Sequence, residues 1–312
     1  MSSHAESSGR AIKAAVIGLG SMGFGMAQSM KRASLDVVGY DISLTAVERF
    51  VAEGGGRADT PAEAAKGADI VVSVVVNAAQ TEAVLFGPDS IASVMKPGAV
   101  FLSSATMDPA IARRLSEKVE ALGLHYLDAP ISGGATKAAK GELTIMASGS
   151  AEAFAAARPA LDAMAAKVYE LGDAAGTGAA FKMINQLLAG VHIAAACEAI
   201  SLAAKQGLDL AKVYEVITAS AGNSWMFENR VPHVLAGDYT PLSAIEIFVK
   251  DLGIVQDVAR SERYPVPLAA AALQMYLAAA GAGMGHDDDS SLARLYAQLS
   301  GATLPGANSQ KE

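Results

Sequence analysis

Two polar side chains interrupt an apolar stretch in the middle of the chain, and their types suit proton transfer and the orientation of hydroxyl groups. Lys182 stands among Ala, Phe, Met and Ile residues, and Asn185 follows three positions later. Residues at this spacing lie on the same face of a helix. Such a lysine is either a surface residue whose long side chain reaches water or a functional residue that accepts or donates a proton. For Asn185 the alternative is an ordinary surface amide.

A glycine-rich turn near the amino terminus has the spacing of a phosphate-binding loop. Gly18, Gly20 and Gly23 follow an apolar run and open a predicted helix. In this pattern the first glycine makes a tight turn, the second lets the backbone approach a pyrophosphate, and the third lets helix and strand pack closely. The N–H groups at the helix start then face the phosphates. The expected dinucleotide contacts are Gly18, Leu19, Gly20, Ser21, Met22 and Gly23; the alternative is a plain glycine-rich turn.

An acidic residue at the end of the second predicted strand makes the dinucleotide interpretation more specific. Asp41 directly follows the strand expected at residues 36–40. A carboxylate in this place accepts the hydroxyls of an adenosine ribose and repels a 2′-phosphate. The sequence therefore predicts NAD as the cofactor, with NADP less favoured. The alternative is that Asp41 caps the next helix together with Ser43.

Short apolar runs alternate with helical patterns through the first half of the chain. This alternation predicts crossover units and a parallel sheet with helices on both faces. The expected strands are residues 12–17, 36–40, 69–76, 99–103, 125–128 and 167–171. The expected helices between them are residues 22–33, 44–52, 61–66, 109–122 and 151–165. The fold class is therefore α/β, beginning with a Rossmann-type doubly wound parallel sheet.

The glycine-rich residues 172–178 separate the two halves of the chain, and beyond them the sequence predicts helices and no strands. A long helix is expected over residues 179–206, and its nearly all-round apolar character is typical of burial between domains or subunits. Further helices are expected at residues 210–219, 224–235, 244–262, 266–280 and 290–299. We expect an NAD-binding domain over 11–173, an all-helical substrate and oligomerisation domain over 174–303, and disordered tails over 1–10 and 304–312.

Composition excludes several function classes. The 312 residues carry a net charge of -8, whereas general nucleic-acid binding requires a basic surface. The single cysteine, Cys197, excludes a disulfide framework and a multi-thiolate metal site, and no metal-ligand cluster is visible. The longest apolar stretch contains His192 and Glu198, so we expect no membrane span. Residues 1–10 are polar and lack an apolar signal segment, which predicts a cytoplasmic protein.

Four motifs in order make the chain resemble the β-hydroxyacid dehydrogenase family, the group that contains 3-hydroxyisobutyrate dehydrogenase and tartronate semialdehyde reductase. The resemblance extends from about Ile12 to Leu299. The motifs are the extended glycine turn at residues 18–27, Asp128-Ala-Pro-Ile-Ser-Gly-Gly134, Gly178-Ala-Ala-Phe-Lys-Met-Ile-Asn185 and Lys250-Asp-Leu252. Four motifs in the right order are more specific than any one of them.

The resemblance implies NAD-dependent oxidation of a short hydroxy acid and assigns roles to individual residues. It makes Lys182 the general acid/base for the reacting hydroxyl and Asn185 a residue that orients the substrate. Ser132, Gly133 and Gly134 become the seat of the substrate carboxylate. Their residue types agree with this role, because two glycines free backbone N–H groups to face an anion and the serine hydroxyl adds a donor. A simple loop is the alternative for this segment.

Further cofactor contacts are expected at Val76, Asn77, Thr106 and Lys250. Thr106 keeps its place in the family pattern, but Ala105 lacks the hydroxyl that many members carry there, so the local hydrogen bonds cannot be copied from the family. Neighbouring residues on a helix do not face each other, so we do not expect Lys250 merely to pair with Asp251. A solvated surface lysine is the alternative.

The substrate is predicted from the segment at residues 283–292, which is similar to that of members that oxidise four-carbon sugar acids such as L-threonate. L-Threonate or a close tetronate is therefore expected, with 3-hydroxyisobutyrate or tartronate semialdehyde as alternatives. Within this segment, His286 or Asp287 is a candidate to reach a terminal hydroxyl. The other interpretation of the acidic residues 287–289 is an N-terminal helix cap.

A dinucleotide-binding module without catalysis is the alternative from another class. Non-catalytic relatives replace the lysine at the position of Lys182, whereas this chain keeps both Lys182 and Asn185. The predicted partners are therefore a small hydroxy acid and other copies of the chain, with neither nucleic acid nor membrane. A homodimer or homotetramer is expected, because the long apolar helix needs more cover than one small domain offers.

Overall fold

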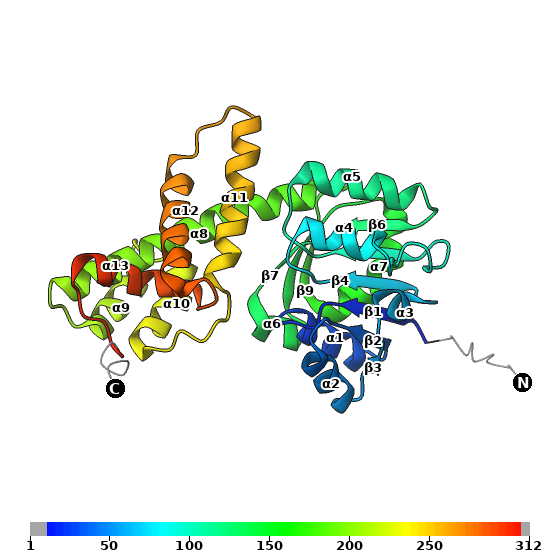
Figure 1. Ribbon diagram of the computed structural model, residues 1–312, viewed down its shortest axis with the longest axis horizontal. Coiled ribbons are helices and arrows are strands. Elements are labelled where there is room, and N and C mark those ends of the chain that lie inside the picture. Colours follow the sequence, from blue (N-terminus) through cyan, green and yellow to red (C-terminus); the bar gives the residue numbers. More distant parts are fainter. Residues whose placement is uncertain (1–10, 307–312) are drawn as a thin grey trace, which may run out of the picture. The chain divides into compact units, whose positions relative to one another are not determined.

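The computed structural model describes residues 11–306, which form two compact units (Figure 1). The first unit ends at Lys182 and the second begins at Met183, inside the long helix α8 (Thr177–Lys205). This division falls later in the chain than the predicted boundary after residue 173. Residues 1–10 and 307–312, most of the predicted tails, lie outside the described residues, whereas Leu304 is buried in the core of the second unit.

A six-stranded parallel sheet forms the centre of the first unit, with the strand order β3-β2-β1-β4-β5-β6. The order reverses between β1 and β4, as in doubly wound dinucleotide-binding sheets, and the predicted fold class is confirmed. The strands are β1 (Lys13–Ile17), β2 (Asp36–Tyr40), β3 (Gly56–Arg57), β4 (Ile70–Ser73), β5 (Val100–Ser103) and β6 (His125–Asp128).

Helices cover both faces of this sheet. On β1, Ala14 and Val16 belong to the core under α1, α2 and α7, while Ala15 and Ile17 point the other way into the core under α3, α4 and α5. Because both faces are buried, the central strands β1, β4 and β5 each carry only one polar residue, at one end of the strand. The helices are α1 (Gly23–Arg32), α2 (Leu44–Ala52), α3 (Pro61–Ala65), α4 (Ala78–Phe86), α5 (Pro109–Glu120) and α7 (Ala151–Met164).

A second, three-stranded sheet corrects the sequence-based strand assignment. It has the order β7-β8-β9, with β7 antiparallel to β8 and β8 parallel to β9. The strand predicted at residues 167–171 exists, but it belongs to this sheet, and β3 is the sixth strand of the parallel sheet. Only two residues long, β3 has no periodicity to recognise. The strand predicted at 167–171 is β9 (Ala165–Glu170), and the elements between β6 and α7 that were not predicted are β7 (Ile131–Ser132), α6 (Gly134–Lys140) and β8 (Leu143–Ala147).

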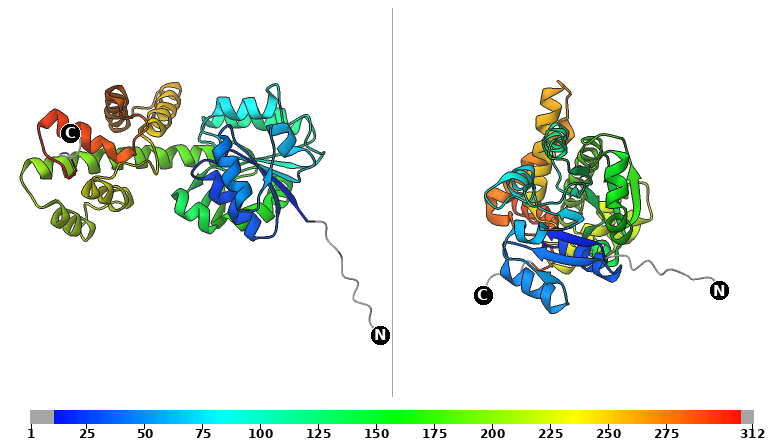
Figure 2. Two further views of the ribbon diagram at one scale, coloured as in Figure 1. Left: turned by 60° about the horizontal axis from the view of Figure 1, so that its bottom comes forward. Right: turned by 90° about the vertical axis from the view of Figure 1, so that its right-hand side faces the viewer.

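Every regular element in the described part of the second unit is helical (Figure 2). Its core joins Ile193 and Ile200 of α8 to Phe248 and Tyr276 from two later helices, and Cys197 is buried in the same core. The elements after α8 are α9 (Leu210–Thr218), α10 (Trp225–Ala236), α11 (Ile245–Ser261), α12 (Pro267–Ala279), η1 (Ala280–Met284), η2 (Asp289–Ser291) and α13 (Leu292–Ser300).

Two helical segments of the described residues have the length and apolar composition of a membrane span, namely α8 and Pro267–Met284. A helix in the core of a soluble protein passes the same test. Half of the most apolar window of α8 is buried, and Ile193 and Ile200 lie in the core of the second unit. Packing within the protein thus accounts for part of the apolar character of α8, while Phe181, Ile184 and Leu202 remain more than half exposed.

Candidate active site

The predicted cofactor residues lie along the carboxyl edge of the parallel sheet. Asp41 follows β2, residues 18–23 follow β1, Val76 and Asn77 follow β4, and Thr106 follows β5. These four strands are neighbours in the order β2-β1-β4-β5, so the segments lie side by side along one edge. Open α/β sheets bind their ligands at this edge, where the strand order reverses.

The glycine loop has the backbone geometry that its sequence predicts. Gly18 has a φ of +99°, and a Cβ added there would lie 2.6 Å from the carbonyl oxygen of Val74. A Cβ on Gly23 would lie 1.9 Å from the carbonyl oxygen of Gly18, so α1 can begin against the turn only because both residues are glycine. Next to Gly20 nothing lies within 4 Å of the Cβ position. The loop is thus closely packed on its inner side and open where a pyrophosphate would approach.

Asp41 is bound to this loop by its side chain. Its Oδ2 accepts a hydrogen bond from the N–H of Leu19 over 2.6 Å, and its Oδ1 accepts one from the N–H of Ser43 over 2.8 Å. The N-cap of α2 is Ser43, whose hydroxyl accepts from the N–H of Ala46. A carboxylate has about four acceptor sites. Asp41 therefore retains acceptor capacity for ribose hydroxyls while it holds the turn, so the residues present fit a dinucleotide.

Asn77 has a structural task that the sequence reasoning missed. Its Oδ1 accepts from the N–H of Gln80 over 2.9 Å, and Gln80 Oε1 accepts from the N–H of Val76 over 2.8 Å. This reciprocal capping orders the turn from β4 into α4. The Val76 side chain is 47% exposed, and Thr106 is half-buried in the β5–α5 connection. Their contacts with the cofactor remain predictions.

The proposed carboxylate seat is a turn that requires glycine. Ser132 ends β7 and pairs with Thr144 of β8, so this segment belongs to the second sheet and is not a simple loop after β6. Gly133 and Gly134 have φ values of +135° and +76°, both in the region that favours glycine. A Cβ on Gly133 would lie 2.9 Å from the Lys137 side chain, whereas nothing lies within 4 Å of the Cβ position at Gly134, so the turn is open at Gly134.

Asp128, which the sequence reasoning left without a role, holds the start of α8. It is the last residue of β6 and is 1% exposed. Its Oδ2 accepts from the N–H of Gly176 over 2.9 Å and from the N–H of Ala179 over 2.8 Å. Ser148 donates to the same oxygen over 3.4 Å and accepts from the N–H of Gly178 over 2.9 Å. The first N–H groups of a helix have no partner within it, and here these two side chains supply acceptors.

This anchorage positions the general acid/base candidate. Lys182 is buried and follows Ala179 by three residues on α8, so the turn that carries it begins at the Asp128 carboxylate. Burial raises the pKa of Asp128 to about 6, although the N–H groups of Ala179 and Gly176 act in the opposite direction. The sequence signal that could have indicated the anchoring role of Asp128 is a single acidic residue at the end of a buried strand.

A chain of polar side chains joins two other predicted site residues within the second unit. Asn185 donates to Gln186, and Gln186 donates to Asp251. The ammonium of Lys250 lies 2.8 Å from Asp251 Oδ1. We expected neighbouring residues on a helix not to face each other, but the long side chain of Lys250 bends back and pairs with the carboxylate of Asp251. The predicted contact of Lys250 with the cofactor remains a prediction. Sequence reasoning assigned no role to Gln186 or Asp251.

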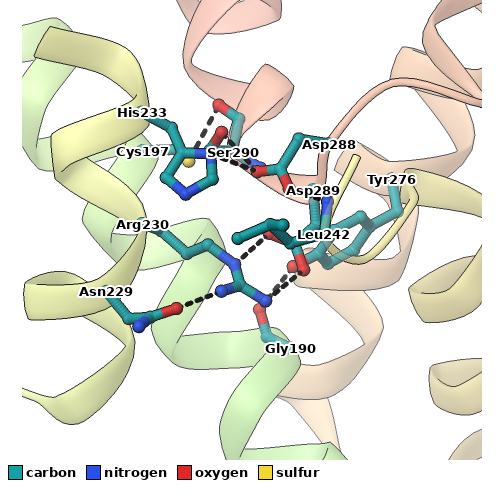
Figure 3. A network of polar contacts seen from close by, with 10 residues as sticks. All are labelled: Gly190, Cys197, Asn229, Arg230, His233, Leu242, Tyr276, Asp288, Asp289 and Ser290. Carbon is teal, nitrogen blue, oxygen red and sulfur yellow. Dashed lines mark hydrogen bonds and ion pairs between the residues drawn. The ribbon is translucent and has the colours of Figure 1, made fainter. Parts of the chain in front are cut away.

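The acidic segment predicted to bear on substrate choice is largely structural (Figure 3). Asp289 accepts from Arg230 through both oxygens, over 2.5 and 3.1 Å. Asp288 caps η2 by accepting from the N–H of Ser290, and it also accepts from the N–H of Leu242. Both carboxylates are fully buried. The cap interpretation is thus confirmed for Asp288.

His286 and Asp287 were the two candidates in this segment for a contact with the substrate, and the structure bears on Asp287 alone. Asp287 is paired with Arg294, with 2.7 Å between Oδ2 and the guanidinium, so its carboxylate already has a partner. The substrate contact of His286 remains a prediction. Within residues 11–306, no group of three or more histidine, cysteine or acidic side chains is placed to hold a metal ion.

Two protein-family models together cover most of the chain. Residues 13–172 match the NAD-binding domain of 6-phosphogluconate dehydrogenase. Residues 176–296 match the model described as the NAD-binding region of NADP-dependent 3-hydroxyisobutyrate dehydrogenase. The first model covers the parallel sheet with the glycine loop, and the second begins just before α8 and includes Lys182 and Lys250.

Similar proteins agree with this assignment over almost their whole length. L-Threonate dehydrogenase of Cupriavidus necator is 54% identical, covering 93% of this chain and 97% of that protein. A 3-hydroxyisobutyrate dehydrogenase structure from Salmonella typhimurium is 50% identical with a TM-score of 0.87, covering 91% of this chain and 99% of that one. The structure of 3-hydroxyisobutyrate dehydrogenase from Mycobacterium tuberculosis is 29% identical with a TM-score of 0.80, covering 92% of this chain and 99% of that one. The chain therefore belongs to the β-hydroxyacid dehydrogenase family of NAD(P)-dependent oxidoreductases.

Proposed function

We propose that the protein oxidises L-threonate to 2-dehydro-L-erythronate, a 2-oxo-tetronate, with NAD. The observation that carries the choice of substrate is the 54% identity to the L-threonate dehydrogenase of Cupriavidus necator over nearly the full length of both chains. The reaction is a two-electron oxidation in which the C–H bond of the alcohol carbon gives a hydride to NAD, the hydroxyl gives its proton to a base, and a ketone forms.

The preference for NAD over NADP follows from Asp41. Its carboxylate stands at the end of β2, tied to the glycine loop through Leu19. In this fold the residue at that place meets the adenosine ribose, so a negative charge accepts the ribose hydroxyls and repels a 2′-phosphate. The same charge therefore supports both the binding of NAD and the rejection of NADP.

In this reaction each polar side chain of the candidate site has a separate role. Bound NAD supplies the hydride acceptor. Lys182 Nζ takes the proton of the reacting hydroxyl as carbonyl character develops at the carbon. Ser132 and the N–H groups of Gly133 and Gly134 bind the carboxylate, and Asn185 orients the substrate. Lys250, held by Asp251, contacts the cofactor from the helical part of the chain.

A second candidate substrate, 3-hydroxyisobutyrate, is favoured by the name of the Salmonella typhimurium structure, which is 50% identical to this chain. Tartronate semialdehyde, reduced in the reverse direction, is a further alternative within the family. A non-catalytic dinucleotide-binding module is less well supported, because Lys182 and Asn185 are both retained.

The rest of the proposal concerns organisation and surroundings. The residues up to about 173 bind the dinucleotide, and the helical residues 174–303 provide substrate contacts and self-association. The protein acts in the cytoplasm as a homodimer or homotetramer. Its partner is a small hydroxy acid, and neither nucleic acid nor a membrane takes part.

The proposal is tested by following NADH absorbance with purified full-length protein and five acids: L-threonate, D-threonate, D-erythronate, 3-hydroxyisobutyrate and D-glycerate. Lys182→Ala is measured in parallel and is expected to lower kcat by about 10²- to 10⁴-fold, the usual contribution of a general acid/base. Lys205→Ala is the matched control, since this exposed lysine ends the same helix.

Turnover of L-threonate well above that of the other acids, lost only in Lys182→Ala, is the expected result. Preference for 3-hydroxyisobutyrate or D-glycerate would retain the mechanism and reject the tetronate assignment. NADH binding without oxidation of any acid, with either NAD or NADP, would favour the non-catalytic module.

A further inference from the structure

We infer that Gln186 and Asp251 are positioning residues that determine which end of the Asn185 amide faces the substrate. The inference rests on the proposed function and deepens it, because Asn185 is the residue proposed to orient the hydroxy acid. All three residues lie in the second unit, on α8 and α11.

Three polar contacts in series connect Asn185 to Lys250. Asn185 Nδ2 donates to Gln186 Oε1 over 2.9 Å, and Gln186 Nε2 donates to Asp251 Oδ2 over 2.5 Å. Asp251 Oδ1 lies 2.8 Å from Lys250 Nζ. Gln186 and Asp251 are both buried, so water offers little competition for these contacts. The series thus links a proposed substrate contact to a proposed cofactor contact.

The direction of the series is set at the Asp251 end. A carboxylate oxygen accepts hydrogen bonds, and Asp251 Oδ1 lies 2.8 Å from Lys250 Nζ, which leaves Oδ2 as the acceptor for Gln186. Gln186 must therefore turn its Nε2 toward Asp251, which leaves its Oε1 toward Asn185. Asn185 in turn must present Nδ2 to Gln186. Its own carbonyl oxygen, Oδ1, is then left on the other side of the amide as an acceptor.

This orientation matters for the chemical group that Asn185 can recognise. An amide oxygen accepts a hydrogen bond from a hydroxyl, whereas it repels a carboxylate oxygen. The Oδ1 end of the fixed amide therefore binds a hydroxyl of the substrate and discourages binding of the carboxylate at that end. A hydroxy acid is then bound with a hydroxyl, and not its carboxylate, against Asn185 Oδ1.

The two positioning residues should give different results on substitution. Gln186→Met breaks the connection to Asn185 but leaves the pair between Lys250 and Asp251. Asp251→Asn keeps the side-chain shape and changes both connections, because an amide can also donate and no longer neutralises Lys250. A role confined to packing α8 against α11 would lower stability in both variants without separating substrate from cofactor.

The experiment measures kcat and KM for whichever acid of the panel the wild-type full-length protein oxidises best, and the Kd of NADH by fluorescence. For Gln186→Met we expect the KM of the acid to rise about tenfold, as for the loss of one oriented hydrogen bond, with the Kd of NADH unchanged. For Asp251→Asn we expect both the KM of the acid and the Kd of NADH to rise. Gln206→Met, at an exposed glutamine just after α8, is the matched control and should change neither.

Thermal unfolding of each variant establishes that it is folded, and Asp251→Asn provides the test should Gln186→Met fail to fold. An unchanged KM of the acid in a folded Gln186→Met, or in a folded Asp251→Asn, would overturn the inference while the proposed function stands. Equal rises of the acid KM and the NADH Kd in Gln186→Met would overturn it as well. If the wild type oxidises none of the acids, the proposed function fails and this inference fails with it.

Discussion

The N–H of Leu19 and the carboxylate of Asp41 are joined by a hydrogen bond of 2.6 Å between the ends of two adjacent strands. Leu19 belongs to the loop expected to receive the pyrophosphate, and Asp41 is expected to meet the adenosine ribose. One side chain therefore contributes to recognition of the ribose and to the shape of the phosphate loop. A substitution at Asp41 should affect both.

Asp41→Asn keeps the size of the side chain and removes its charge. We expect the affinity for NADH to fall by about tenfold or more, because charge-assisted hydrogen bonds contribute about 1.5–3 kcal/mol each. The affinity for NADPH should rise relative to that for NADH, since the repulsion of the 2′-phosphate is removed. Fluorescence titration with both cofactors measures this ratio. Asp36→Asn, at the exposed amino end of the same strand, is the control, and an unchanged ratio in Asp41→Asn would contradict the assignment.

Alanine substitutions at two glycines of the loop should separate folding from binding. Gly18→Ala places a Cβ against the Val74 carbonyl at a φ of +99°, so we expect a destabilisation of more than about 1 kcal/mol. Gly20→Ala meets nothing within 4 Å and should leave stability unchanged, yet weaken NADH binding because its methyl group occupies the approach of the pyrophosphate. Thermal unfolding and NADH titration of both variants test this. Equal NADH affinity of wild type and Gly20→Ala would place the pyrophosphate elsewhere.

The elements that the sequence predicted best are those with strong local signals. α2 was predicted at its observed bounds because Ser43 caps it and an apolar face recurs along it. β3 was missed because a strand of two residues has no periodicity. β8 was missed although its burial alternates along the strand, because it is only five residues long and no further strand was expected between residues 128 and 167. Local pattern therefore predicted the main sheet but could not assign the short strands.

Asp128 should make the protein less stable as the pH rises, whereas a carboxylate with a lowered pKa makes a protein more stable as the pH rises. Its pKa is about 6 in the folded protein, above the value near 3.9 of an unperturbed aspartate, so the folded state binds the proton more tightly. The associated stabilisation is present below about pH 4 and is lost as the pH rises to about 6. The pKa difference corresponds to about 3 kcal/mol.

Asp128→Asn removes this titration. The difference in free energy of unfolding between wild type and variant should therefore change between pH 4 and pH 7, roughly the interval between the two pKa values, and stay constant above it. Urea unfolding at a series of pH values provides the measurement. Asp173→Asn, at an exposed position before α8, serves as the control. A pH-independent difference for Asp128→Asn would mean that folding does not raise the pKa of this carboxyl.

Loss of Arg230 should destabilise the helical unit strongly. Arg230→Met leaves the Asp289 carboxylate fully buried without its ion-pair partner, and breaking such a pair costs about 3–5 kcal/mol. Lys212→Met removes one partner of the exposed pair with Glu215 and should change stability by less than about 1 kcal/mol. Urea unfolding of both variants makes the comparison. Equal effects would show that Arg230 and Asp289 are not a buried pair in solution.

The candidate site was predicted unevenly for a physical reason. The glycine loop and Asp41 are recognisable because their spacing follows from one strand–turn–helix unit. Asp128 was not assigned, since its partners at Gly176 and Ala179 are about 50 residues away and only the fold brings them together. The pairing of Arg230 with Asp289 spans 59 positions, so the acidic segment resembled a substrate contact when considered alone.

Because Cys197 is buried in the core of the helical unit, its reaction with a thiol reagent reports the opening of that unit. Cys197 is the only cysteine of the chain, it is 2% exposed, and burial raises the pKa of its thiol. Thiol reagents attack an exposed thiolate, and neither condition is met while the core around α8 is intact. At thiol-reagent concentrations high enough for labelling to outpace reclosing, the labelling rate of the unmodified protein should therefore equal the rate at which the helical unit opens. Opening of that unit can thus be timed separately from the parallel-sheet unit, without introducing a probe.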